Sequence, residues 1–186
     1  MRIGGGRARG TRLRAKGGRG VRPTSTLVSD AVFNSLAPRI AGACVLDLFA
    51  GTGRLGIEAL SRGAREAVFV ERDPRNAALI RQNLAAAGLS DRGVVRRADA
   101  LAAAEGERRR FDLIFLDPPY GRGLAAEALR RVAAGTLLAA GGLVIAEGHW
   151  RDDPGEIAGL ARVRTARYGE TAVWVYARAA GREEGA

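Results

Sequence analysis

The sequence predicts an α/β protein built on a mostly parallel β-sheet that helices cover on both faces. Two observations carry this prediction. Short apolar runs alternate along the chain with segments of helical periodicity, which is typical of successive βαβ units. The first apolar run also ends in glycines directly before a helix, as in doubly wound sheets that bind a ligand beyond the strand ends.

The expected elements follow in order from these patterns. Residues 24–36 carry an apolar stripe at helical spacing, with Thr24 as a candidate cap. Residues 43–49 form a short apolar run that predicts the first strand. The further expected strands are 67–71, 93–97, 111–116 and 143–146, and the further expected helices are 54–62, 74–87, 124–134 and an Ala-rich segment near 99–104.

The last two strands are predicted to form a hairpin. Residues 161–166 and 171–178 read as strands and flank Tyr168-Gly169, a turn signal. Strands joined by so short a turn run antiparallel, whereas βαβ units give parallel pairs. The complete expected sheet therefore has seven strands and is mostly parallel, with an antiparallel C-terminal hairpin.

Positive charge is concentrated at the N-terminus. The chain has 30 basic and 20 acidic residues and a formal net charge of +10. Residues 1–22 contain eight of the basic residues and no acidic one, so residues 23–186 carry 22 against 20. We expect residues 1–22 to be a basic, Gly-rich arm, either mobile or paired as a hairpin on the body, and residues 23–186 to form one domain. Such an arm indicates a polyanionic partner.

Composition excludes several classes of protein. No apolar run approaches the roughly 18 residues of a membrane span, and no hydrophobic signal region follows the basic N-terminus, so we expect a cytoplasmic protein. One cysteine, Cys44, and one histidine, His149, give no reason to expect a disulfide or a metal site. We interpret Cys44 as a core residue, and we do not expect His149-Trp150 to line a site.

A glycine-rich turn after the first strand indicates a nucleotide-like ligand. Gly51, Gly53 and Gly56 match G-x-G-x-x-G, and Glu71 follows at the end of the second strand, where it can bind ribose hydroxyls. Asp47 lies beside the turn, where a carboxylate would oppose a pyrophosphate. S-adenosylmethionine fits better than a nicotinamide dinucleotide, because it has no phosphate and carries a sulfonium and an ammonium group. The oxidoreductase interpretation stays as the last alternative.

Other residues after the strand ends complete the expected cofactor site. Phe49 lies inside the glycine turn and Arg72 follows Glu71. Asp99, after the third strand, is a candidate for the adenine amino group, although a helix cap explains it nearly as well. Ala100 is its neighbour in the same segment.

The fourth strand ends in Asp117-Pro118-Pro119-Tyr120, which predicts the catalytic loop. Two prolines stiffen the loop, so that Asp117 and the Pro118 carbonyl are presented as hydrogen-bond acceptors. An exocyclic amine of a nucleobase is a poor nucleophile, since its lone pair is delocalised into the ring. Two acceptors on its N–H bonds can free that lone pair for attack on a sulfonium methyl, while Tyr120 stacks on the base.

At this point the sequence resembles the RsmD family, the bacterial small-subunit ribosomal RNA guanine-N2 methyltransferases. The matching residues are Met1-Arg2-Ile3, Gly5, Arg9-Gly10, Arg22-Pro23-Thr24, Phe33-Asn34, residues 46–53, residues 55–64, Val70-Glu71, Asn83-Leu84, residues 117–120, Tyr168-Gly169 and Thr171. The resemblance implies a class I methyltransferase fold that transfers methyl from S-adenosylmethionine to guanine N2 of 16S rRNA in an assembling small subunit.

The chain departs from the family pattern at two places. Residues 26–30 read Thr-Leu-Val-Ser-Asp where the family usually has an Asp-Arg-Val-Arg-Glu-like segment, so two cations are missing near the arm. Arg54 stands where a small residue is usual. The first departure leaves the choice of guanine undetermined by the sequence.

The expected RNA contacts lie in the arm. Guanine N2 is hidden inside a helix, so the target is expected to be an unpaired or flipped-out base. The candidates for phosphate contacts are Arg7, Arg9, Arg12, Arg14 and Arg22. A solvated tail without RNA contacts is the alternative interpretation of the arm.

Two other functions stay open from the sequence alone. The Asp-Pro-Pro-Tyr chemistry also serves methylation of exocyclic amines in other RNA or in DNA, and a protein of this fold can be a non-catalytic RNA-binding assembly factor. The intact Asp47, Glu71 and residues 117–120 favour an enzyme over a decayed site. A monomer is the default expectation for the oligomeric state.

Overall fold

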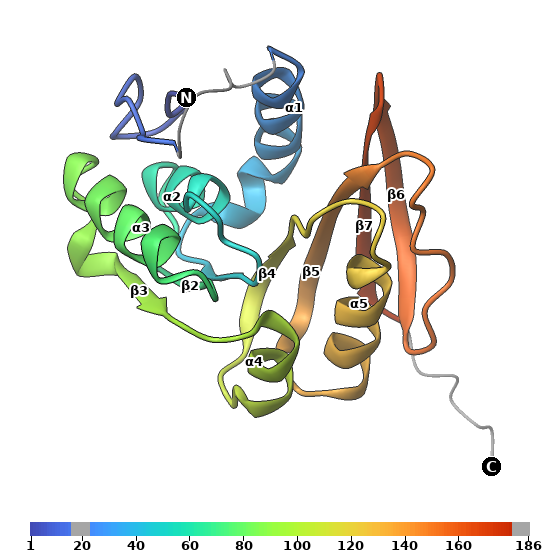
Figure 1. Ribbon diagram of the computed structural model, residues 1–186. Helices are drawn as coiled ribbons and strands as arrows, with labels where there is room; N and C mark the ends of the chain where they lie inside the picture. Colours follow the sequence, from blue (N-terminus) through green and yellow to red (C-terminus); the bar gives the residue numbers. More distant parts are fainter. Residues whose placement is uncertain (16–22, 180–186) are drawn as a thin grey trace.

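The computed structural model describes residues 1–15 and 23–179, and in it a seven-stranded sheet forms the centre of the protein (Figure 1). The strand order is β3-β2-β1-β4-β5-β7-β6. The strands are β1 Cys44–Asp47, β2 Glu66–Val70, β3 Gly93–Arg96, β4 Phe111–Leu116, β5 Leu138–His149, β6 Leu160–Tyr168 and β7 Thr171–Arg178. The first five pair in parallel, and β7 pairs antiparallel with both β5 and β6. The predicted α/β class, seven strands and C-terminal hairpin are confirmed.

Helices cover both faces of this sheet. They are α1 Pro23–Ile40, α2 Arg54–Ser61, α3 Pro74–Ala86, α4 Ala100–Gly106 and α5 Leu124–Ala134, with a short 3₁₀ helix η1 at Ser90–Arg92. The first three pack on one face and α4 and α5 on the other (Figure 1). Alternate residues of the inner strands enter the two cores, as Val45 and Leu46 of β1 do. Two buried faces explain why the strands are continuous apolar runs in the sequence.

Three predicted boundaries were wrong. The first helix begins at Pro23 and continues past Pro38 to Ile40, so Thr24 lies in its first turn and is not the cap. Proline is tolerated in a first turn, where its missing N–H has no helical partner. Strand β5 has twelve residues, because Leu138 pairs with Phe111 before a register shift and the strand continues to His149 beside β7. The β6 strand runs from Leu160 to Tyr168, longer than expected at both ends.

The described part of the arm packs on α2. An antiparallel bridge joins Arg2 to Arg12, and Ile3 and Leu13 enter the core on the α1–α3 face. Of the two expectations for the arm, the hairpin is the one found for residues 1–15, and a mobile segment is not. Arg22 lies outside the described residues.

The order of the strands determines where a ligand can bind. Strand β1 lies between β2 and β4. After β1 the chain adds β2 and β3 on one side of it, and then crosses back to add β4 on the other side. Crossovers on either side of such a switch point leave a crevice beyond the carboxyl ends of the strands.

Candidate active site

A cavity of about 700 Å³ opens at the carboxyl ends of β1, β2, β4 and β5. This volume suits a ligand the size of a nucleoside with a side chain. The predicted residues that line it are Phe49, Gly51, Glu71, Arg72, Asp99, Ala100, Asp117, Pro118, Pro119 and Tyr120. Asp47 and Gly53 do not line it.

The glycine turn closes one wall of the cavity. Gly51 has a φ of 54° and donates its N–H to Glu71 Oε2 at 2.9 Å. Gly53 has a φ of 80° at the start of α2, and a Cβ there would lie 3.0 Å from Ile80 Cγ2. Gly53 is therefore needed for the turn and its packing, and not for contact with a ligand.

Two acids, Glu71 and Asp99, line the cavity near the ends of β2 and β3. Glu71 is held in place by Gly51 and by the Asp73 N–H, which donates to Glu71 Oε1 at 2.8 Å. Asp99 accepts hydrogen bonds from the Leu101 and Ala102 N–H groups, so it is the cap of α4. Since Asp99 also lines the cavity, the two interpretations of this residue are compatible.

Asp47 is buried beneath the site. Its Oδ2 accepts from the Gly56 N–H at 3.1 Å, while Oδ1 has no hydrogen-bond partner among the described residues. Burial raises the pKa of Asp47 from 3.8 to about 7, against the lowering effect of the Gly56 hydrogen bond and the Arg54 charge. The Asp47 carboxylate therefore cannot contact a ligand in the cavity. It can act on one only through its charge, from the other side of the glycine turn.

The catalytic loop places Asp117 in the cavity and Tyr120 at its mouth. Removal from water raises the pKa of Asp117 to about 7, and the nearby Glu147 charge acts in the same direction, while the Arg54 charge opposes the rise. Tyr120 has 45% of its surface exposed.

Sequence reasoning missed Glu147 and the role of Arg54. Arg54 Nη2 lies 3.3 Å from Glu147 Oε2, and both side chains line the cavity. Arg54 Nη1 is buried and has no hydrogen-bond partner among the described residues. The guanidinium thus lies among three acids, Asp47, Asp117 and Glu147. Glu147 could have been found, because it directly follows the predicted strand 143–146.

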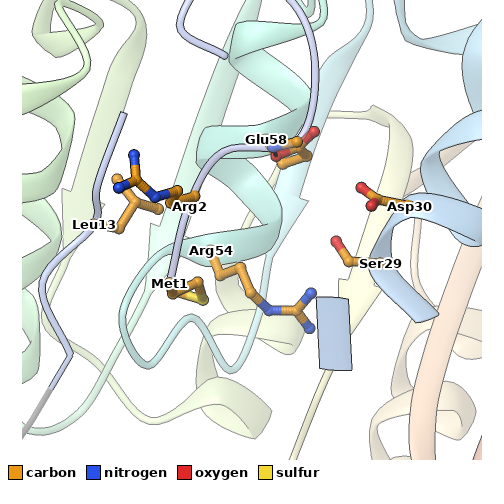
Figure 2. Close-up of a pocket in the computed structure, with 8 residues that line it drawn as sticks. Met1, Arg2, Leu13, Ser29, Asp30, Arg54 and Glu58 are labelled. Atoms are coloured by element: carbon orange, nitrogen blue, oxygen red, sulfur yellow. Dashed lines mark hydrogen bonds between the residues drawn. The ribbon is translucent and has the colours of Figure 1, made fainter. Parts of the chain in front are cut away.

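The arm is fastened to α2 by a buried carboxylate. Glu58 accepts from the Gly4 N–H at 2.8 Å, the Gly5 N–H at 2.9 Å and Arg62 Nε at 2.6 Å. Ser61 adds three hydrogen bonds, since its carbonyl accepts from the Arg7 N–H, its Oγ accepts from the Ala8 N–H, and the same Oγ donates to the Gly5 carbonyl. Figure 2 shows Glu58 against the arm, with Arg54 one turn earlier on α2 extending away from it. On the arm's side, these bonds use only backbone groups.

The arginines in the described part of the arm are exposed. Arg7, Arg9, Arg12 and Arg14 are exposed, and the bond from Arg14 Nη1 to Gln82 Oε1 is itself at the surface. Arg54 lines both the small pocket under the arm and the large cavity, so the arm lies next to the site on its α2 side (Figure 2).

The remaining sequence expectations concern single residues and whole helices. Cys44 is buried at the amino end of β1, away from the cavity, and burial raises the pKa of its thiol. His149 does not line the cavity, but its ring packs against Tyr120. Within residues 1–15 and 23–179, no three His, Cys, Asp or Glu side chains are grouped to hold a metal ion. In the same residues, no helix is long and apolar enough to cross a membrane.

The strand order, the glycine turn and the cavity beyond the strand ends define a class I methyltransferase fold. The family model "Conserved hypothetical protein 95" matches residues 1–177, and the chain belongs to this family. A relative from Escherichia coli (strain K12), named ribosomal RNA small subunit methyltransferase D, is 37% identical over 147 residues, which are 79% of this chain and 74% of the relative. The predicted resemblance to the RsmD family is confirmed.

Two further similarities cover nearly the whole chain. The Bacillus subtilis protein YlbH, named provisionally as an rRNA methyltransferase, is 37% identical over 95% of this chain and 98% of its own length. The solved structure of Escherichia coli yhhF, described provisionally as a methyltransferase, superposes with a TM-score of 0.85 at 34% identity. That match covers 97% of this chain and 99% of the other.

Proposed function

We propose that this protein transfers a methyl group from S-adenosylmethionine to the exocyclic N2 of a guanine in 16S ribosomal RNA. The observation that carries the proposal is the Asp117–Tyr120 loop at the mouth of a cavity of about 700 Å³. The named relatives support the RNA, since the Escherichia coli and Haemophilus influenzae proteins are called ribosomal RNA small subunit methyltransferase D.

The residues of the cavity fit S-adenosylmethionine. This cofactor supplies an electrophilic methyl on a sulfonium. Asp117 and Glu147 line the cavity and Asp47 lies buried beneath it, so the surroundings favour a cation. Glu71 is positioned for ribose hydroxyls and Asp99 for the adenine amino group. Asp47 Oδ1 has no hydrogen-bond partner among the described residues, so when ionised it would add negative charge beneath the site.

The catalytic loop would act on the amine of the target base. The Asp117 carboxylate and the Pro118 carbonyl accept its two N–H bonds, which frees the nitrogen lone pair and orients it toward the cavity. Tyr120 stacks on the base and holds it in that position. Because the Asp117 carboxyl accepts its N–H bond best when it is ionised, its pKa of about 7 makes its ionisation state part of the mechanism.

The N-terminal arm, residues 1–22, would bind the RNA backbone. Its exposed arginines lie beside the site. Each phosphate contact should make the slope of log K against log salt concentration steeper by about 0.7–0.9. We infer a monomeric, cytoplasmic protein acting on an assembling small subunit, with residues 23–186 as the methyltransferase domain.

One assay tests the proposal. The protein is given labelled S-adenosylmethionine with small subunits, naked rRNA or duplex DNA, and the product nucleotide is identified by mass spectrometry. We expect N2-methylguanine in rRNA, and a rate lowered about 10²–10³-fold by Asp117→Ala, the scale of one lost transition-state contact. Asp91→Ala, at an exposed position on η1, is the matched control. Methylated DNA, another base, or no transfer despite cofactor binding would each contradict the proposal.

A further inference from the structure

Three aromatic rings extend from the catalytic loop across the surface of the protein. The Tyr120 and His149 centroids are 6.4 Å apart in an edge-on arrangement, and the His149 and Trp150 centroids are 6.0 Å apart with planes 29° from parallel. Trp150 is 36% exposed and Tyr120 45%, although large aromatic side chains are normally covered. We call Tyr120, His149 and Trp150 the aromatic row.

Two arginines flank the outer end of this row. The Arg167 guanidinium lies 4.1 Å from the Trp150 ring centroid and that of Arg151 lies 5.0 Å from it. Arg167 Nε donates to the Gly169 carbonyl at 2.8 Å, which fixes the guanidinium at the β6–β7 turn. Cations so placed raise the positive potential at the face of the indole and leave further N–H donors for a ligand.

The aromatic row is joined to the catalytic loop by backbone hydrogen bonds. The Gly121 N–H donates to Asp152 Oδ2 at 2.8 Å, and the Asp152 N–H donates to the His149 carbonyl at 2.8 Å. The Trp150 N–H donates to the Glu170 carbonyl at 3.0 Å. His149 Nδ1 accepts from the Arg151 N–H at 3.2 Å, so the ring is held in one orientation. The nearby acid Asp152 is thus engaged in tying the loops together.

This combination matches single-stranded nucleic acid. Exposed aromatic faces stack bases regardless of sequence, and adjacent arginines neutralise the phosphates between them. An acidic protein segment would pair with the arginines and an apolar one would pack on the rings. RNA can do both, because its phosphates pair with arginines and its bases stack on rings. The row begins at Tyr120, so a strand whose target base enters the cavity places its next nucleotides along it.

We propose that the aromatic row is a second RNA-binding surface, on which a nucleotide next to the target guanine packs on the Arg167 guanidinium, which covers a face of Trp150, and on the exposed part of the indole, while its phosphates contact the outer N–H groups of Arg167 and Arg151. The inference rests on the proposed function. It assigns to the body of the protein a substrate contact separate from that of the arm.

Fluorescence gives a direct test, since the chain has two tryptophans and Trp174 is only 1% exposed. A single-stranded RNA oligonucleotide is titrated into the full-length protein saturated with S-adenosylhomocysteine. We expect quenching of the exposed indole that is absent from Trp150→Phe. No quenching at saturating RNA, with binding confirmed by anisotropy, would overturn the proposal.

Kinetics on small subunits give the second test. Trp150→Ala is expected to raise KM on the order of 5- to 100-fold, the scale of one stacked base, and to leave kcat within about twofold. Arg167→Gln should raise KM and reduce its salt dependence, whereas Arg110→Gln, exposed before the start of β4, should change neither. An unchanged KM in Trp150→Ala would overturn the aromatic row and leave the proposed function intact.

The remaining outcomes separate the two proposals. Quenching by RNA without methylation of any rRNA would support the aromatic row and contradict the proposed function. A raised KM on subunits without quenching by naked RNA would show that the row contacts a protein of the subunit, which contradicts the RNA surface.

Discussion

Replacing Asp47 by asparagine should stabilise the protein and weaken its preference for a cationic ligand. Burial raises the pKa of Asp47 from 3.8 to about 7. Such a difference corresponds to roughly 4 kcal/mol of unfavourable free energy for the ionised carboxylate in the folded state. Asparagine keeps an oxygen that can accept from the Gly56 N–H but carries no charge, so most of this cost should disappear.

The sign of the effect determines its pH dependence. Below about pH 3, Asp47 is protonated in both the folded and the unfolded protein, so its ionisation costs nothing. As pH rises from about 4 to about 7, the unfolded carboxyl ionises while the folded one keeps its proton, so stability is lost over this range and the loss levels off above about pH 7. The Asp47→Asn protein should therefore be more stable than wild type by only about 1 kcal/mol near pH 4.5 and by up to about 4 kcal/mol at pH 8.5.

Urea unfolding at the two pH values measures this difference, and Asp117 is common to both proteins and largely cancels. Calorimetry at pH 8.5 should then show that the variant has lost affinity for S-adenosylmethionine more than for the uncharged thioether S-adenosylhomocysteine. An equal or lower stability at pH 8.5 would refute the electrostatic reasoning. An unchanged ratio of the two affinities would show that the Asp47 charge does not serve the ligand.

Three further perturbations have defined outcomes. Glu147→Gln removes a charge that raises the pKa of Asp117, so the acid limb of kcat/KM, expected near neutrality, should move to lower pH; an upward shift would contradict this assignment. Glu58→Gln removes the charge that receives the arm's N–H groups and should cost about 2–3 kcal/mol, with faster hydrogen exchange at residues 4 and 5; retained protection there would contradict the fastening of the arm. Gly53→Ala should lower stability by roughly 1–3 kcal/mol in thermal unfolding, more than Gly88→Ala, because both have positive φ but only Gly53 is crowded; equal losses would show that packing at Ile80 does not matter.

The fold could be predicted because its strands are short, apolar and separated by glycine-terminated helices. The exception is β5, where Gly141 and Gly142 interrupt the apolar pattern and conceal the first half of the strand. That half is held by pairing with Phe111 of β4, a contact between distant segments that no local pattern encodes. The extension of α1 to Ile40 has a similar cause, since Leu36 and Ile40 are both buried in the core.

The position of the candidate site could be predicted from the sequence, but the directions of its side chains could not. The rule that ligands bind beyond strand ends correctly placed Glu71, Asp99 and Asp117 around one cavity. The same rule cannot say which way a side chain points, and Asp47 turns beneath the glycine turn to meet Gly56. Glu147 directly follows the predicted strand 143–146, so the same rule could have identified it as a cavity residue.

The surfaces around the site depend on tertiary structure even more. The aromatic row joins a residue of the β4–α5 loop to residues at and after the end of β5, and Arg167 of the β6–β7 hairpin flanks it, so these residues are distant in sequence. The arm depends on Glu58 of α2, which the sequence pattern identified as family-specific without revealing its partner.

The distribution of charge suggests how such a protein would handle a polyanionic substrate. The cavity is lined by acids, with Asp117 and Glu147 at the reacting end, and would repel phosphates. Positive charge lies outside it, on the arm beside α2 and on Arg151 and Arg167 beside β5 and the β6–β7 turn. The arm lies beside α2 on the α1–α3 face, whereas β6 and β7 lie beyond β5 at one end of the sheet (Figure 1). An RNA strand held by both would keep its backbone at the rim, and only an uncharged base could enter the acidic cavity, where the acids would then act on its amine.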